Sequence, residues 1–286
     1  MANGGLQYTF ARLNIAEKLI VVNVLFFILD GLSMALLGFG FSKWFHLPKD
    51  FVAFFGQPWS LVTYSFFHGG FGHIFWNMLM LYFTGRIFMN LFDARRFINV
   101  YFLGVILGGL FFLLSYNVFP TLISANTALI GASAGVSAVL IFICTYIPNQ
   151  EVRIIFFNVK LWYVGAFFIL MDLVQISYGD NLGGRLAHLG GALLGYVYAR
   201  QLLKGMDIGS GFSNVLDGLG NLFKKRERKA PLKTVYKKGR KESREDYDKQ
   251  ARQKKIDAIL DKISKSGYES LSKAEKDFLF KAGKED

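Results

Sequence analysis

The sequence predicts an all-α membrane protein, in which six membrane-spanning helices precede a short basic helical cytoplasmic tail. Three observations predict this fold class. Hydrophobic residues make up 52% of the 286 residues and charged residues only 19%, a composition too apolar for an ordinary soluble domain. Six apolar segments of about 20 residues each precede residue 204. Finally, 22 of the 33 Lys and Arg residues follow residue 203, so the two parts of the chain are expected to have different solvents.

The six segments are expected to cross the membrane as helices. A helix needs about 20 apolar residues to cross the hydrocarbon, and none of these segments shows the alternation of a barrel strand. The first segment is longer than a signal-peptide core and no small-residue cleavage site follows it, so we expect it to be retained. The predicted spans cover residues 18–41, 73–92, 97–116, 128–147, 161–178 and 185–203.

Positive residues in the short loops predict the orientation, because Lys and Arg collect on the cytoplasmic side. Arg12 and Lys18 precede the first span, Arg95 and Arg96 lie between the second and third, and the basic tail follows the sixth. The loop 117–127 carries no charge. We therefore expect a multi-pass integral protein of the plasma (bacterial inner) membrane with both termini in the cytoplasm.

Polar residues lie near the outer ends of the second, fourth and sixth predicted spans. His73 and Asn77 are in the second, Ser133 is in the fourth and His188 is in the sixth. With the fourth span starting at residue 128, Ser133 would lie roughly 8 Å below its outer end. Polar side chains at such a depth are costly and mark functional sites.

Small residues predict close contact between the fourth and sixth spans. Gly131 and Gly135 have GxxxG spacing in the fourth, and Gly191 and Gly195 have it in the sixth. Small residues at this spacing let two helix backbones approach closely in lipid. The Ser133 hydroxyl would then come within hydrogen-bond reach of the His188 ring.

This combination of residues suits nucleophilic catalysis. A serine hydroxyl is a weak nucleophile until a base such as histidine accepts its proton, and the resulting oxyanion needs donors. His73 and Asn77 are four residues apart on one helix face and can supply donors. Because no acid lies near His188 on its own helix apart from Asp180 in the preceding loop, the sequence favours a Ser133–His188 dyad over a triad.

Each feature also has a structural interpretation. The GASAG run at 131–135 can be a packing motif, and His188 can be an interfacial residue. His68 and His73 lack an acidic or cysteine partner at ligand spacing, so neither a metal nor another cofactor is expected. Asp30 and Asp172 are acids within predicted spans, which can relay protons or bond a neighbouring helix.

Three motifs resemble those of the rhomboid intramembrane serine proteases: HGGFGHIFWN at 68–77, GASAG at 131–135 and AHLGG at 187–191. The resemblance covers nearly all of residues 1–203 and implies a six-transmembrane-helix rhomboid-like bundle. The sequence differs from some members of that family, which have arginine at the position of Ser60 and an aromatic residue at the position of Ser137. The resemblance implies that Ser133 is the nucleophile, that His188 is the base, and that the oxyanion or its surroundings are supported by His73, Asn77, His68 and Gly131.

The resemblance implies single-span transmembrane substrates, cut near the outer membrane face. The alternatives are a non-catalytic rhomboid-fold binder of membrane proteins and a small transporter, in which Asp30 and Asp172 would line a polar path. Membrane lipids are expected partners, since a basic stretch at 224–241 would attract anionic headgroups. Nucleic acid is not expected, because no recognised binding motif is present.

The predicted organisation is a protease domain at 1–203, a basic flexible linker at 204–244 and a small helical segment at 245–286 with no identified partner. Helices are expected over 245–264 and 272–282, with Ser272 and Glu275 forming a capping box. The first loop, residues 40–67, is rich in aromatic residues and is expected to lie in the interface, either shaping substrate entry or serving as an anchor.

Overall fold

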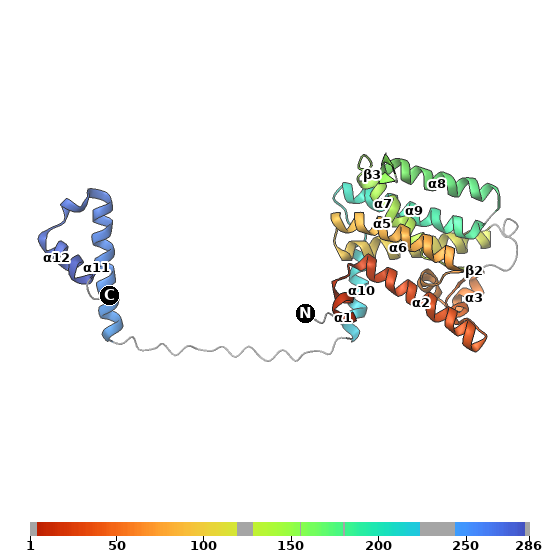
Figure 1. Cartoon of the computed structure of the whole chain (residues 1–286), viewed down its shortest axis with the longest axis horizontal. Coiled ribbons are helices and arrows are strands. Elements are labelled where there is room, and N and C mark those ends of the chain that lie inside the picture. Colours follow the sequence, from red (N-terminus) through yellow and green to blue (C-terminus); the bar gives the residue numbers. More distant parts are fainter. Residues whose placement is uncertain (1–4, 119–127, 155, 180, 224–243, 284–286) are drawn as a thin grey trace. The chain divides into compact units, whose positions relative to one another are not determined.

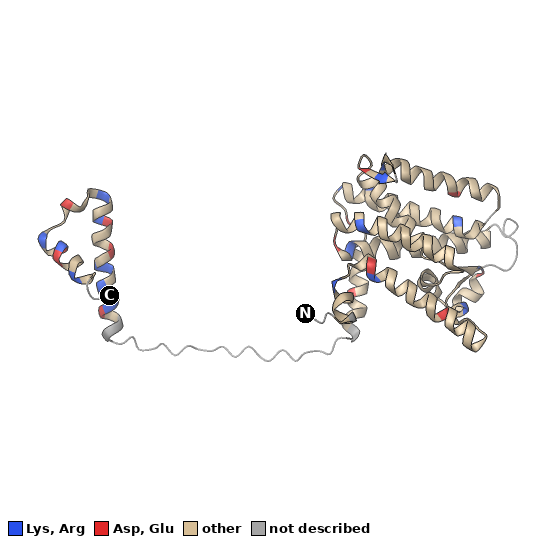
Figure 2. Ribbon diagram, in the orientation of Figure 1, with Lys and Arg blue, Asp and Glu red and all other residues tan. Residues whose placement is uncertain are grey.

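The computed structural model describes residues 5–118, 128–154, 156–179, 181–223 and 244–283. The chain forms two compact units, Met1–Lys224 and Lys225–Asp286. Both are built mainly of helices (Figure 1). Lys, Arg, Asp and Glu are sparse along the helices of the first unit and frequent in the second (Figure 2).

Six long helices of the first unit correspond to the six predicted spans. Shorter helices and two small antiparallel sheets connect them. The long helices are α2 Ile15–Leu37, α5 Phe71–Leu91, α6 Ala94–Val118, α7 Ser133–Tyr146, α8 Leu161–Ser177 and α9 Leu182–Leu203. The other elements of this unit are α1 Leu6–Arg12, η1 Phe41–Trp44, β1 Leu47–Pro48, α3 Phe51–Gly56, α4 Ser60–Thr63, η2 Tyr64–Phe66, β2 Ala128–Leu129, β3 Glu151–Ile154, β4 Phe157–Lys160 and α10 Ser210–Phe223.

By length and apolarity, two helices among the described residues are candidate membrane spans, so the predicted count of six crossings is not confirmed. Helices α2 and α6 are long and apolar enough to cross a membrane, whereas the apolar helices α7 and α8 are shorter. Helices α5 and α9 have the length but carry polar side chains, among them His73 and Arg185. Apolar side chains along α2 are exposed, including Leu25, Ile28 and Leu32, as expected for a helix in contact with lipid.

Helices α6, α7 and α9 form the tightly packed centre of the first unit. A Cβ on Gly191 of α9 would lie 2.0 Å from the Ala134 carbonyl oxygen of α7, and one on Gly195 would lie 2.2 Å from that of Ala138. The predicted close approach of these two helices is therefore confirmed. The predicted role of the other glycine pair was wrong, because Gly131 precedes α7 and Gly135 faces the Tyr101 ring of α6.

Helix α7 begins at Ser133, not at residue 128 as predicted. The preceding Leu129 and Ala128 pair with Leu47 and Pro48 of the first loop. Gly131 then adopts a φ of +117°, which no helix allows and which favours glycine. The predicted position of Ser133, five residues into its helix, was therefore wrong. Ser133 stands at the first turn of its helix.

Part of the first loop packs into the first unit. Leu47 and Tyr64 are buried, and the Tyr64 hydroxyl donates to the Val105 carbonyl of α6 at 2.8 Å. The Tyr64 carbonyl in turn accepts from the Gly131 N–H at 3.0 Å. The loop therefore holds the segment that leads into Ser133.

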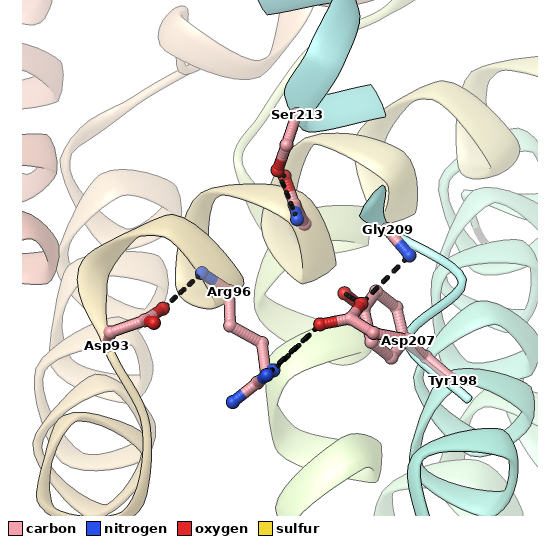
Figure 3. Close-up of polar contacts among 7 residues, drawn as sticks. Asp93, Arg96, Tyr198, Asp207, Gly209 and Ser213 are labelled. Atoms are coloured by element: carbon pink, nitrogen blue, oxygen red, sulfur yellow. Dashed lines mark hydrogen bonds and ion pairs between the residues drawn. The ribbon is translucent and has the colours of Figure 1, made fainter. Parts of the chain in front are cut away.

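Residues 210–223, which lie within the predicted flexible linker, form helix α10 as part of the first unit. The buried side chains of Asn99 in α6 and Ser213 in α10 exchange two hydrogen bonds, at 2.7 and 2.9 Å. Beside them Asp207 bonds Arg96, Tyr198 and the Gly209 N–H (Figure 3). Burial alone would raise the pKa of Asp207, but these hydrogen bonds outweigh it and lower the pKa. The polar cluster attaches α10 to α6 and α9.

The second unit contains α11 Arg244–Ser266, the short η4 Tyr268–Ser270 and α12 Lys273–Ala282. Both predicted tail helices are confirmed, as is the capping box of Ser272 and Glu275. Ile259 and Leu271 are buried within this unit. The basic stretch 224–241 lies outside the described residues.

Candidate active site

Four of the predicted site residues line one cavity of the first unit. The cavity has a volume of about 580 Å³ and is bounded by α5, α9, the start of α7 and the segment that precedes it. His73, Asn77, Ser133 and His188 all contribute to its wall, together with Arg185. His73 and His188, which are 115 positions apart in the sequence, therefore line the same cavity.

Ser133 is the first residue of α7 and faces this cavity. The first backbone N–H groups of a helix have no partner within the helix, and the helix dipole makes this end favourable for negative charge. An oxyanion beside Ser133 would therefore lie close to backbone donors. The Ala132 N–H is already engaged, since it donates to His68 Nε2 at 3.4 Å.

His73 presents one ring nitrogen to the segment before Ser133. Its Nδ1 accepts from the Gly69 N–H at 3.3 Å, so in the neutral ring Nε2 carries the proton and is the donor. A Cβ on Gly131 would lie 2.7 Å from this Nε2 and 3.7 Å from Ser133 Oγ. The absence of a side chain at Gly131 thus leaves the space between the imidazole donor and the serine hydroxyl open.

Asn77 and His68 complete the surroundings of His73. Asn77 lies one turn after His73, and its amide donates to the His73 carbonyl at 2.8 Å, which leaves its second N–H for the cavity. His68 is buried, and its ring meets that of His73 edge to face at 5.1 Å. Asn77 can therefore donate to an anion in the cavity, whereas His68 holds neighbouring groups in place.

His188 has an acidic partner that the sequence analysis missed. Its Nδ1 lies 3.0 Å from Oδ1 and 3.3 Å from Oδ2 of Asp172, which belongs to α8. Arg185, one turn before His188 on α9, donates to the same Oδ1 at 3.0 Å. The position of Asp172 as an acid within an apolar helix was noted, but not its contact with His188. Asp180, the other acid considered, lies outside the described residues.

A second, more apolar cavity adjoins the first. It measures about 280 Å³, lies between α5, α7 and α8, and shares Asn77, Ser133 and His188 with the first cavity. Its apolar wall includes Val136, Leu140, Phe167, Phe168 and Met171. Ser133 therefore lies where a cavity of mixed polarity meets a more apolar one.

Among the residues that the structure describes, no group of three His, Cys, Asp or Glu side chains is arranged to hold a metal ion. What the arrangement does offer is a hydroxyl nucleophile, an imidazole base and several hydrogen-bond donors around one space. These are the parts required for attack of a hydroxyl on a carbonyl group.

Comparison with known sequences identifies two families. The Rhomboid domain matches residues 55–205, which include every one of these site residues. A second match, to the Family of unknown function DUF6576, covers residues 241–282 in the second unit.

Individual relatives match the first unit. The chain is 29% identical over 162 residues to RHOMBOID-like protein 12, mitochondrial, of Arabidopsis thaliana. The aligned region covers 52% of this chain and 48% of that protein. It is 26% identical over 172 residues to Rhomboid protein 1, mitochondrial, of Saccharomyces cerevisiae (58% and 47%). It is 30% identical over 145 residues to the Presenilin-associated rhomboid-like protein, mitochondrial, of Rattus norvegicus (50% and 37%).

These matches span less than half the length of each of the three relatives. The relatives support an integral membrane protein. They are mitochondrial by name, so they do not support the expected plasma (bacterial inner) membrane.

Proposed function

This chain belongs to the rhomboid family, and from that premise we propose that it is an intramembrane serine protease. It hydrolyses peptide bonds of transmembrane proteins near the outer membrane face, with Ser133 as nucleophile and His188 as base. The observation that carries the proposal is the cavity that Ser133 and His188 line together with His73 and Asn77.

The reaction begins when Ser133 Oγ attacks the carbonyl carbon of the scissile bond. Its proton passes to His188 Nε2, and the carbonyl electron pair moves onto the oxygen. His73 Nε2–H, the free Asn77 N–H and the backbone at the start of α7 stabilise this oxyanion, each donor contributing roughly 10² to 10³ in kcat. The proton on His188 then passes to the leaving nitrogen as the C–N bond breaks. Water then loses a proton to His188 and attacks the acyl carbon, and His188 returns this proton to Ser133 Oγ as the ester C–O bond breaks.

The substrate class follows from where this chemistry takes place. A peptide bond within a membrane helix is shielded by helix hydrogen bonds, so the helix must unwind locally before Ser133 can reach it. Glycine and other weak helix formers near the cut lower the cost of unwinding. Single-span proteins with such residues near the outer interface are the proposed substrates.

The proposed topology has six crossings, made by α2 and α5 to α9, with both termini on the side that carries Arg95 and Arg96. The outer face is then the side on which α5 and α7 begin, and the residues at these two helix starts line the cavity. This orientation holds for whichever membrane contains the protein.

Cleavage of a single-span substrate in liposomes tests the proposal. We expect the full-length protein to release a fragment cut near the outer interface, and Ser133→Ala and His188→Ala to abolish release while keeping the wild-type unfolding temperature. Release that survives both substitutions would refute the assignment of the two residues. Binding of a panel of single-span proteins without any cleavage would favour a non-catalytic binder.

A further inference from the structure

The Nδ1 atom of His188 is engaged by a carboxylate. This leaves Nε2 as the ring nitrogen that can accept the Ser133 hydroxyl proton. Asp172 lies within hydrogen-bond distance of Nδ1 through both of its carboxylate oxygens, at 3.0 and 3.3 Å. A carboxylate only accepts, so Nδ1 must be the protonated nitrogen and Nε2 the basic one. This is the tautomer that accepts a proton from serine.

From this geometry we propose that Asp172 is a positioning residue of the reaction, so that Ser133, His188 and Asp172 act as one three-residue unit. The proposal rests on the proposed protease function and adds a member to it. Asp172 fixes the tautomer and the direction of the imidazole, and its negative charge stabilises the imidazolium that forms while Ser133 attacks. No proton moves to Asp172. The Nδ1 proton stays on His188 throughout.

The Arg185 side chain offsets the cost of burying the Asp172 carboxylate. Asp172 is buried at 6% exposure in an apolar helix, where an unpaired charge would be costly. Arg185 and His188 lie one turn apart on the same face of α9, and both donate to Asp172 Oδ1 at 3.0 Å. The guanidinium compensates the negative charge in the resting enzyme. It leaves the carboxylate in contact with the neutral histidine.

A purely structural role for Asp172 makes different predictions. Only three residues of α8 are buried, namely Leu161, Gly165 and Asp172, so the ion pair with Arg185 could serve mainly to attach α8 to α9. In that case the loss of either charge would lower stability to a similar degree. Turnover would fall only as far as α8 is displaced. A catalytic positioning role instead predicts a loss of kcat that depends on the carboxylate and not on the ion pair.

The test uses the full-length protein in liposomes with a single-span substrate that the wild type cleaves, and measures kcat, KM and unfolding temperature. We expect Asp172→Asn to lower kcat on the order of 10² to 10⁴-fold with KM within about threefold, as loss of the orienting carboxylate does in a serine triad. Arg185→Gln, which retains the Asp172–His188 bond, should lower kcat by less than about tenfold.

Two further variants keep the test decisive. If Asp172→Asn does not fold, the double variant Asp172→Asn/Arg185→Gln removes both charges together and should show the same loss of kcat. Asp30→Asn is the matched control, because Asp30 also lies in an apolar helix, accepts from the Ser42 N–H at 2.9 Å and lines neither cavity beside Ser133. It should retain wild-type kcat.

The outcomes separate this inference from the protease function. If cleavage requires Ser133 and His188 but Asp172→Asn keeps kcat within about threefold, or if Arg185→Gln loses as much kcat as Asp172→Asn, the inference is overturned and the protease function stands. If the wild type cleaves nothing, the function itself fails.

Discussion

At the scale of single residues, the site depends on a glycine as much as on its polar groups. Gly131 has a φ of +117°, and an added Cβ would meet His73 Cε1 and Nε2 at 2.7 Å. The backbone there is strained for any other residue, and the imidazole cannot move without losing its bond to the Gly69 N–H. Gly131 therefore keeps open the space between His73, the proposed oxyanion donor, and Ser133, the proposed nucleophile.

We predict that Gly131→Ala lowers kcat at least about 100-fold, because it displaces His73, one of the proposed oxyanion donors. The cost in stability should be about 1–3 kcal/mol. Cleavage kinetics and thermal unfolding on the same samples measure the two effects. Gly31→Ala in α2, where an added Cβ meets nothing within 4 Å, is the control and should leave kcat unchanged. Normal turnover by Gly131→Ala would contradict this account of the donor.

The residues of the site could largely be identified from the sequence, whereas one of their contacts could not. Ser133, His188, His73 and Asn77 stood out because polar groups are rare within apolar segments. The partnership of Asp172 with His188 depends on how α8 packs against α9, and no spacing along one helix encodes it. The helix of His188 carries no acid, so the sequence favoured a dyad, whereas Asp172 lies on the preceding helix, α8.

At the scale of elements, helices α7 and α9 contact each other through backbone atoms at two glycines of α9. Gly191 and Gly195 bring the Ala134 and Ala138 carbonyl oxygens close to the axis of α9. No apolar side chain separates the two helices there, so Ser133 at the start of α7 and His188 on α9 are placed by the same contact. The contact between these two helices is therefore part of the proposed catalytic geometry.

Gly191→Ala should destabilise the protein by about 1–3 kcal/mol, because its Cβ would lie 2.0 Å from the Ala134 carbonyl oxygen and force the helices apart. Equilibrium unfolding in mixed micelles measures this change. Gly218→Ala in α10, where an added Cβ meets nothing within 4 Å, is the matched helical control. It should be neutral or stabilise by up to about 1 kcal/mol. Equal stability of the two variants would refute the close contact.

The stability of helix α12 in the second unit is predicted to depend on pH. The Glu275 carboxylate accepts from the Ser272 N–H and hydroxyl and from Lys262, and these bonds lower its pKa from 4.5 to about 2. Because the pKa is lower in the folded state, the stabilisation is present above pH 4.5 and is lost as the pH falls towards 2. Hydrogen exchange of the full-length protein, normalised to intrinsic rates, should show α12 losing protection across this window.

Glu275→Gln is the control for this effect. Its amide cannot titrate, so the protection of α12 should start lower at neutral pH and change less between pH 5 and 2 than in the wild type. A wild-type α12 whose protection follows the same pH dependence as that of the variant would contradict the assignment.

Element boundaries were harder to predict than the elements themselves. The fourth span was placed five residues early, because Ala128, Leu129 and Ile130 are apolar and a short apolar run does not distinguish a strand from a helix. Helix α10 was missed because its Gly and Ser residues indicated a linker. Its apolar residues Phe212, Val215, Leu216 and Leu219 do recur at helical spacing, which was the available signal.

At the scale of the whole molecule, the proposed six crossings can be checked without any substrate. In a Cys144→Ser background, single cysteines at Thr9 of α1 and Asn221 of α10 should react with a membrane-impermeant maleimide from the same side. Val52 of α3, which is 84% exposed in the first loop, should react from the opposite side. Thr9 and Asn221 on opposite sides would mean an odd number of crossings between them.

The most direct measurement of the central claim is covalent trapping of the nucleophile. The full-length protein in liposomes is treated with a fluorophosphonate, and the adduct is located by peptide mass spectrometry. We predict a single adduct on Ser133, formed in the wild type and abolished by His188→Ala, because the hydroxyl is reactive only beside its base. An adduct on another residue, or undiminished labelling of Ser133 in His188→Ala, would contradict the assignment of Ser133 and His188 as nucleophile and base.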